Sequence, residues 1–427
     1  MSFQQCLTKS EFPGKIFTFE QGLTLVHQDL PGIPVAVVDV WVKAGAIAEP
    51  REWPGIAHFL EHMIFKGTQQ LPPGVFDQLI EHRGGMTNAA TSHDYAHFYL
   101  TTAASDLPET LPYLAEILLQ AAIPDAELDY EREVVCDEIR GSDDDPDWLG
   151  FQCLCEMLYP HHAYGRSVLG THQDVQQFTA HQLRCFHRNH YQPENMTVAM
   201  VGDIREAAAI AYVEEIFSDF PQRWDCPPRQ SSPLTIPKIR QHRTLKIPQL
   251  GPSRLTLGWS GPGIDHLQEN IGLDILAAVL AGSRCSRLVQ HLREELGIVF
   301  EIHSCFSLQR DASLFTINAV LAPQQVEQVE TEICAAIHRL HTTPISHGEL
   351  ARAQRMLCHD YIFSTETPAQ LAGLYGYYQT LARADVAIAY PQMVRQCQPA
   401  DLQRLAQRYL STEAYALVLL EAANSSP

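Results

Sequence analysis

Apolar residues recur at helical spacing between residues 56 and 65, and this pattern predicts a short helix. Pro54 and Gly55 precede the segment and Gly67 follows it, which is typical of the two ends of a helix. A second segment, 125–140, is rich in strong helix formers and directly follows a proline, so a longer helix is predicted there. These two helices carry most of the residues that suggest a function.

The pattern of the first half of the chain repeats in the second half. Alternating apolar residues predict a strand over 35–42 and another over 254–259. A helix that ends in a small-residue turn follows each strand, over 56–68 and 271–283. The second of these helices has apolar residues where the first has polar ones. We therefore predict an α+β protein whose two homologous halves arose by internal duplication.

A stretch rich in proline and polar residues, 221–233, separates the two halves and is typical of a linker. We predict that residues 1–220 form the half that carries the functional residues. Residues 221–238 are the predicted linker, and residues 239–427 form the second, degenerate half.

Three polar residues stand on the otherwise apolar helix over 56–65. His58 and His62 are four positions apart, so both imidazoles project from one face of a helix. Glu61 shares this face, and the three residues form an H-x-x-E-H motif. Two imidazoles can bind one tetrahedral Zn²⁺, and Glu61 can act as a general base without being a ligand. Burial of these groups without a partner would be unfavourable, and a metal ion would satisfy them.

The helix over 125–140 offers candidates for the third ligand that a catalytic zinc ion usually has. Glu127, Glu131 and Glu138 fall close to one face of this helix. Val134 and Val135 lie on the same side, so we expect the face to point partly inward. A solvated surface position is the competing interpretation for any single glutamate. Spacing alone leaves the choice of ligand open.

The motif from His58 to His62, followed by the segment from Glu131 to Glu138, resembles the M16 zinc metallopeptidases, the pitrilysin and insulinase clan. The chain is most similar to the short-chain branch that includes the mitochondrial processing peptidase beta subunit and its bacterial relatives. This resemblance implies that each half is an antiparallel-rich sheet covered by helices. It also implies that Glu138 is the third ligand of one Zn²⁺ per chain, and that Glu131 is a supporting catalytic acid near the metal.

Shorter segments match the same family in order and spacing along almost the whole chain. They are residues 83–89, 162–165, 191–196, 201–203, 286–288 and 292–297. The resemblance implies that Asn88 and Ala89 belong to an edge that binds peptide substrate, and that Arg293 reaches the substrate from the second half. Phe300 stands where the family has a tyrosine. Competing explanations are that Asn88 is a turn residue and that Arg293 forms a surface ion pair with Glu294 or Glu295.

We therefore predict a zinc-dependent endopeptidase that hydrolyses peptides or unfolded segments, with Glu61 activating a zinc-bound water. The alternatives are a non-catalytic assembly or scaffold subunit of the same fold and a zinc-binding module without hydrolysis. Long members of the family enclose a chamber with four such domains, so this chain is expected to form a dimer. Phe300 favours a heterodimer with a homologous subunit that carries an Arg/Tyr pair over a homodimer.

Composition and net charge restrict the classes of partner and the cellular compartment that we expect for this chain. The chain has 30 basic and 50 acidic residues, a formal charge of −20, which argues against nucleic acid as a partner. No stretch approaches the roughly 18 apolar residues of a membrane span, and residues 1–14 contain no apolar signal segment. We expect a cytoplasmic location and no membrane partner. The 11 scattered cysteines predict reduced thiols rather than a disulfide framework.

Overall fold

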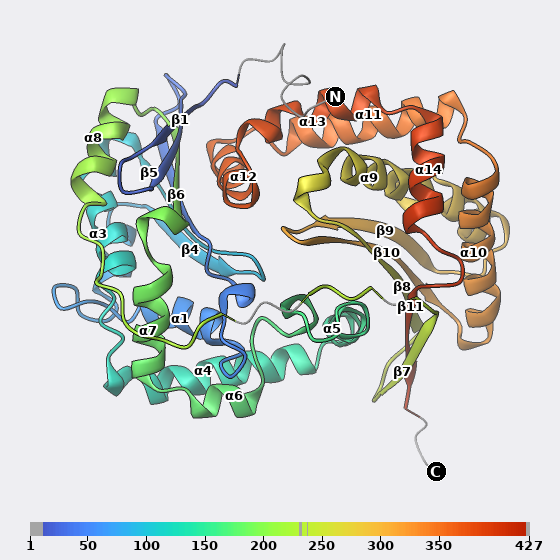
Figure 1. Ribbon diagram of the computed structural model, residues 1–427, viewed down its shortest axis with the longest axis horizontal. Coiled ribbons are helices and arrows are strands. Elements are labelled where there is room, and N and C mark those ends of the chain that lie inside the picture. The colour runs from blue at the N-terminus through green and yellow to red at the C-terminus, as the bar shows by residue number, and fades with distance from the viewer. Residues whose placement is uncertain (1–11, 230–232, 237, 424–427) are drawn as a thin grey trace. The chain divides into compact units, whose positions relative to one another are not determined.

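The computed structural model describes residues 12–229, 233–236 and 238–423 (Figure 1). The predicted linker is therefore described only in part, and most of the segment 1–14 lies outside the described residues. The chain forms two compact units. The first unit spans residues 1–140, 166–231 and 363–389, and the second spans 141–165, 232–362 and 390–427.

The first unit is built on a six-stranded sheet. In spatial order its strands are β1 (Lys15–Thr18), β2 (Thr24–Asp29), β6 (Met196–Gly202), β3 (Val35–Val42), β5 (Ala96–Ala103) and β4 (Met86–Thr91). Only the β2–β6 pair is parallel. Strand β4 lies at the edge of the sheet and pairs on one side with β5, with Asn88 opposite Tyr99 and Thr91 opposite Ala96.

Helices cover both faces of this sheet. The helices of this unit are α1 (Ile56–Ile64), α2 (Val75–Glu81), α3 (Leu107–Leu119), α4 (Asp125–Asp143, which continues into the second unit), α6 (His172–Gln177), α7 (Ala180–His190), α8 (Glu206–Ile216) and α12 (Pro368–Leu381). Figure 1 shows α3 and α8 on one face and α12 on the other. Helix α1 packs against α7, β4 and β5 and buries Phe59, Leu60 and Met63 completely. The two predicted helices are thus confirmed as α1 and α4.

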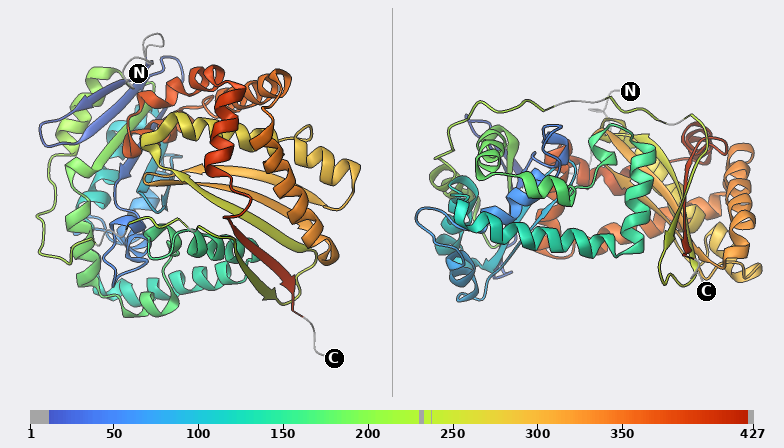
Figure 2. Two further views of the ribbon diagram at one scale, coloured as in Figure 1. Left: turned by 45° about the vertical axis from the view of Figure 1, so that its right-hand side comes forward. Right: turned by 90° about the horizontal axis from the view of Figure 1, so that it is seen from below.

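The second unit contains a five-stranded sheet. In spatial order its strands are β7 (Gln241–Ile247), β11 (Ala416–Ala422), β8 (Ser253–Pro262), β10 (Ala312–Leu321) and β9 (Glu301–Leu308). The helices are α5 (Pro146–Leu158), α9 (Leu267–Ala281), α10 (Val326–Thr342), α11 (His347–Phe363), α13 (Asp385–Gln396) and α14 (Pro399–Tyr409), with a π-helical segment at Val289–Glu295. Figure 2 shows α9, α10 and α14 on one face of this sheet and α5 on the other.

The two sheets share one topology, and the predicted α+β class is confirmed. The order β2-β6-β3-β5-β4 in the first corresponds to β7-β11-β8-β10-β9 in the second, and in both only the first of these pairs is parallel. Helix α9 follows β8 as α1 follows β3. Leu273, Leu276 and Ala277, which we align with the motif residues of α1, are all buried. The degenerate half therefore has an apolar helix at the place of the polar motif.

Each sheet also packs against one helix from the other half of the sequence. Helix α12 covers β3 and β6, and α5 covers β8 and β11. Each compact unit therefore contains segments from both halves of the sequence. The boundaries of the duplicated halves, 1–220, 221–238 and 239–427, stay a prediction. In the part of the chain that the structure describes, no helix combines the length and the apolar character needed to cross a membrane.

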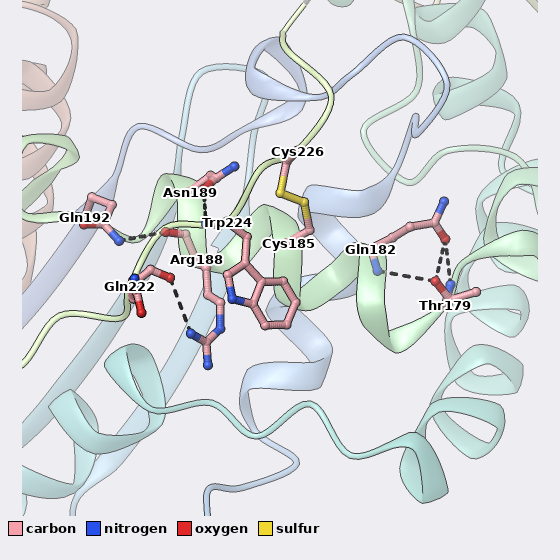
Figure 3. Close-up of a disulfide and its surroundings, with 9 residues drawn as sticks. All are labelled: Thr179, Gln182, Cys185, Arg188, Asn189, Gln192, Gln222, Trp224 and Cys226. Carbon is pink, nitrogen blue, oxygen red and sulfur yellow. Dashed lines mark hydrogen bonds between the residues drawn. A yellow bond between two sulfur atoms is a disulfide. The ribbon is translucent and has the colours of Figure 1, made fainter.

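The expectation that all cysteines are reduced is wrong for one pair. Cys185 on α7 and Cys226 in the predicted linker form a disulfide, with 6.0 Å between their Cα atoms (Figure 3). They are separated by 41 positions, and they meet because the chain after α8 runs back along α7. Their spacing gave no sign of this contact. The other eight cysteines among the described residues are free.

Candidate metal centre

The loop before α1 fixes the start of the helix that carries the motif. Gly55 has a φ of 91°, a left-handed conformation, and a Cβ at this position would lie 2.6 Å from the carbonyl oxygen of Leu169. Both constraints favour glycine. The main chain of residues 54 and 55 can therefore lie directly against residues 169 and 170, and the first turn of α1 is held against that loop.

Glu49 caps α1 from the preceding loop. Its Oε1 accepts hydrogen bonds from the main-chain N–H groups of Gly55 at 3.0 Å and Ala57 at 3.1 Å. The first N–H groups of a helix have no partner within the helix, so these bonds satisfy two of them. The side chain is fully buried, and Arg166 lies 3.8 Å away. Burial raises the pKa of Glu49 to about 8 against the attraction of Arg166. Sequence analysis missed this residue.

His58, His62 and Glu138 meet in space, although Glu138 lies on a different helix. Their ligand atoms all lie within 4.8 Å of one another, and among the described residues no other group of three could hold a metal ion in this way. Glu138 Oε2 is 3.4 Å from Nε2 of His58 and 3.4 Å from Nε2 of His62.

The two separations of 3.4 Å between the carboxylate and the imidazoles suit a zinc ion. Ligand atoms bound to Zn²⁺ at about 2.0–2.1 Å in a tetrahedron are about 3.3 Å apart. Two imidazole nitrogens and one carboxylate oxygen also form a donor set that catalytic zinc sites use, and they leave the fourth position open. The residues present thus fit the metal that their types suggested.

The two histidines differ in their affinity for protons. Burial, together with the nearby His62, lowers the pKa of His58 to about 4, so the imidazole of His58 is neutral near pH 7. Burial also disfavours the charged form of His62, but hydrogen bonds to Glu131 and Glu138 outweigh it and raise the pKa of His62 to about 9. A metal ion must therefore displace a proton from His62 in order to bind.

Glu131 orients His62 instead of joining the three ligand atoms. The Nδ1–H group of His62 donates to Glu131 Oε1 at 2.9 Å, which leaves Nε2 directed at Glu138. Lys66 Nζ lies 2.5 Å from the other oxygen of Glu131. Burial disfavours the charged carboxylate, but His62 and Lys66 outweigh it and lower the pKa of Glu131. Its contacts place Glu131 beside the candidate metal ligands, and its catalytic role stays a prediction. Lys66 was not predicted.

Glu61 lies beside this cluster and is not one of its three members. Burial raises the pKa of Glu61, against an opposing effect of a hydrogen bond from Thr91. The hydroxyl of Thr91 donates to Glu61 Oε2 at 2.5 Å. A carboxylate with a raised pKa next to a metal site has the properties of a general base. Thr91 was also missed from the sequence.

The inward face of α4 differs in part from the prediction. Glu131 and Val135 are buried, four positions apart, whereas Val134 is 40% exposed. One face of a helix includes i and i+4, and Val134 lies off that face. The expectation that both valines accompany the glutamates was therefore wrong for Val134.

The predicted substrate-binding residues occupy two different units. Asn88 and Ala89 lie inside the edge strand β4, so the turn interpretation of Asn88 is wrong. The side chain of Asn88 accepts the main-chain N–H of Ala89 at 2.9 Å. In the second unit, Arg293 pairs with Glu294 at 2.7 Å, as the competing explanation expected, and Phe300 is 65% exposed. A substrate role for Arg293 stays a prediction.

Comparison with known proteins gives matches in both halves. Residues 24–172 match the family model "Insulinase (Peptidase family M16)", and residues 177–357 match "Peptidase M16 inactive domain". The first range contains His58, His62 and Glu138.

Individual relatives are similar over most of their length. An uncharacterized zinc protease of Mycobacterium leprae is 33% identical over 75% of this chain and 72% of its own. The uncharacterized zinc protease YmxG of Bacillus subtilis is 26% identical over 97% of this chain and 99% of its own. The crystal structure of a protease from Helicobacter pylori superimposes with a TM-score of 0.88 and 26% identity, covering 96% of this chain and 99% of that one.

Proposed function

The chain belongs to the M16 family of peptidases, and from this premise we propose that it is a zinc-dependent endopeptidase that hydrolyses peptides or unfolded segments. The observation that supports the proposal most is the triangle of His58, His62 and Glu138, in which the two separations between carboxylate and imidazole suit one tetrahedral Zn²⁺. We propose one zinc ion per chain at this place. The polar motif is absent from the corresponding helix α9 of the second half.

His58, His62 and Glu138 would hold the zinc ion in this mechanism. When bound there, zinc supplies Lewis acidity to the peptide carbonyl and to the attacking water. Glu61 takes a proton from that water during the attack and later gives it to the leaving amine. Glu131, whose negative charge is balanced by Lys66, holds the imidazole of His62 in the required orientation.

The peptide binds as an added strand along β4. This strand has a free edge among the described residues, and main-chain hydrogen bonds to such an edge give affinity without strong side-chain selection. Asn88 and Ala89 lie in the middle of β4. Because the Asn88 side chain already occupies the N–H of Ala89, a substrate that uses this N–H must displace it.

Assembly and location are further parts of the proposal. A dimer completes the substrate chamber, and the phenylalanine at position 300 supports a heterodimer with a subunit that supplies an Arg/Tyr pair. Arg293 then contributes from this chain. A cytoplasmic location is retained as a prediction. Disulfides are rare in that compartment, so the redox state of Cys185 and Cys226 in cells tests it.

The direct test compares Glu61→Gln with His58→Ala. We expect Glu61→Gln to retain one zinc ion per chain and to cleave an unstructured peptide at least about 1,000-fold more slowly. His58→Ala should lose both zinc and cleavage. Unchanged turnover in Glu61→Gln would remove this residue from the mechanism. Zinc-loaded wild-type protein that binds metal but cleaves nothing, with its partner subunit present, would support a scaffold or zinc-binding role.

A further inference from the structure

Thr91 connects the edge strand of the first sheet to the proposed general base. It is the last residue of β4, and its hydroxyl donates to Glu61 Oε2 at 2.5 Å. Hydrogen bonds from a hydroxyl to a carboxylate are short and stronger than those between neutral groups. The elements that carry the two residues, β4 and α1, pack against each other.

The position of this hydroxyl is set by the sheet. Thr91 pairs with Ala96 on β5, and the next residue, Ser92, donates its N–H to the carbonyl of Tyr95 at 2.7 Å. Burial alternates along β4, so that Thr87, Ala89 and Thr91 share the partly buried face. Thr91 therefore has little freedom to move independently of β4.

We propose that Thr91 is a positioning residue that holds the carboxylate of Glu61 ready for proton transfer. The inference rests on the proposed peptidase function. Thr91 keeps its own proton and occupies Oε2, so that Oε1 is free to take the proton of the attacking water and to return it. A glutamate has three side-chain torsions, and a fixed donor limits them to the productive arrangement. Because the same strand pairs with the peptide, binding at the edge and alignment of the base are coupled.

Thr87 supplies a matched control. It lies on the same strand and the same face, and its buried hydroxyl has no hydrogen-bond partner among the described residues. Folding of β4 therefore does not require a hydroxyl on this face. Replacing either threonine with valine keeps the branched shape that favours a strand.

The test measures peptide cleavage by zinc-loaded Thr91→Val, Thr91→Ser and Thr87→Val. We expect kcat of Thr91→Val to fall about 10- to 100-fold with KM and zinc content unchanged, as for the loss of one hydrogen bond to a charged group. Thr91→Ser should recover most of the rate, and Thr87→Val, which changes the same face of β4 without removing a hydrogen bond to Glu61, should reduce kcat clearly less than Thr91→Val does. A wild-type kcat in Thr91→Val, or a failure of Thr91→Ser to restore it, would overturn the proposal. Absence of cleavage by the wild type would refute the peptidase function itself and this inference with it.

A second, independent observation concerns the segment 221–226, here called the linker clasp. The side chain of Gln192 donates to the carbonyl of Pro221 at 2.7 Å. The N–H of Trp224 donates to Asn189 Oδ1 at 3.1 Å (Figure 3). The guanidinium of Arg188 lies 4.6 Å from the centre of the Trp224 ring. The Cys185–Cys226 disulfide closes the clasp covalently.

The two cysteines of the disulfide differ in solvent exposure. Cys185 is 2% exposed on α7, whereas Cys226 is only partly buried. A nucleophile from solvent therefore reaches Cys226 first. We infer that Cys226 is a modification site for small thiols and disulfides. A thiolate attacks the Cys226 sulfur, the S–S bond breaks, and Cys185 leaves as a thiolate that takes up a proton. In the reverse step the Cys185 thiolate attacks the mixed disulfide on Cys226, which re-forms the Cys185–Cys226 bond and releases the small thiol, so that the linker clasp opens and closes with the redox state.

The test treats the oxidised protein with glutathione, quenches with acid and maps the adduct by mass spectrometry. The mixed disulfide should form on Cys226 and not on Cys185, and trypsin should then cut after Arg223 faster than in the oxidised protein. Cys226→Ser should be cut at the fast rate under all conditions, whereas Cys285→Ser, which changes an exposed free cysteine, should behave as the wild type. An adduct on Cys185, or a cleavage rate that does not respond to reduction, would overturn the inference.

Discussion

Replacing Glu131 with glutamine should weaken zinc binding through His62. The carboxylate accepts the Nδ1–H of His62 at 2.9 Å and lies 2.5 Å from Lys66, and it is 4% exposed. Glutamine can still accept the hydrogen bond, but it removes the negative charge that makes the imidazole a stronger donor to metal. Loss of such a second partner typically lowers metal affinity about 10- to 100-fold, or about 1.4–2.8 kcal/mol.

The size of the effect should depend on pH. Glu131 contributes to raising the pKa of His62 to about 9, so in the wild type a proton competes with zinc at neutral pH. Glu131→Gln lowers that pKa and weakens the competition, which offsets part of the loss. At a pH above about 9 the competition disappears in both proteins. The deficit in zinc affinity should therefore be larger at about pH 9.5 than at about pH 7.

Competition with a chelating dye of known affinity measures the zinc constant of each protein at both pH values. Glu127→Gln is the matched control, because it changes a glutamate on the same helix that lies outside the metal cluster. At saturating zinc the cleavage rate should fall much less than the zinc affinity does, since the proposed role of Glu131 acts through His62. Equal zinc affinities for wild type and Glu131→Gln at both pH values would refute the orienting role.

Three further changes test the surroundings of the site. Glu49→Gln keeps a capping oxygen but has no titratable charge. The pKa of Glu49 is about 8 in the folded protein, whereas an ordinary glutamate has a pKa of 4.5. The extra stability of the wild type over this variant, measured by urea unfolding, should therefore decline as pH rises from about 4.5 to 8. A difference that does not change with pH would contradict the raised pKa of the buried Glu49 carboxyl. Gly55→Ala should destabilise by about 1–3 kcal/mol through backbone strain and its clash, and more than Gly74→Ala, which has a similar φ but open space. Cys226→Ser should lower the free energy of unfolding by about 2–4 kcal/mol, since the disulfide closes a loop of 41 positions. A reductant should lower the free energy of unfolding of the wild type by the same amount and leave that of Cys226→Ser unchanged.

The parts of the site that are local in sequence could be predicted. The periodicity of α1 and the spacing of His58 and His62 lie within one helix, where geometry follows from position alone. The α+β class also followed from the repeated order of elements. The choice of Glu138 among the glutamates of α4 needed the family resemblance, because several of them satisfy the same spacing.

The residues that were missed share one property. Glu49, Thr91 and Lys66 are ordinary residue types whose roles come from contacts between different elements, and no spacing rule marks such contacts. The disulfide joins residues 41 positions apart for the same reason. The packing of α5 on β8 and β11 and of α12 on β3 and β6 is also a tertiary feature, since it joins segments that are far apart in the sequence.

The central claim is that one zinc ion is held by His58, His62 and Glu138. The most direct measurement is an anomalous difference map collected at the zinc edge from crystals of the zinc-loaded protein. We predict a single strong peak per chain within about 2.0–2.2 Å of both Nε2 atoms and of a Glu138 oxygen. A peak at another place, or one that the Glu138 side chain does not reach, would contradict the account.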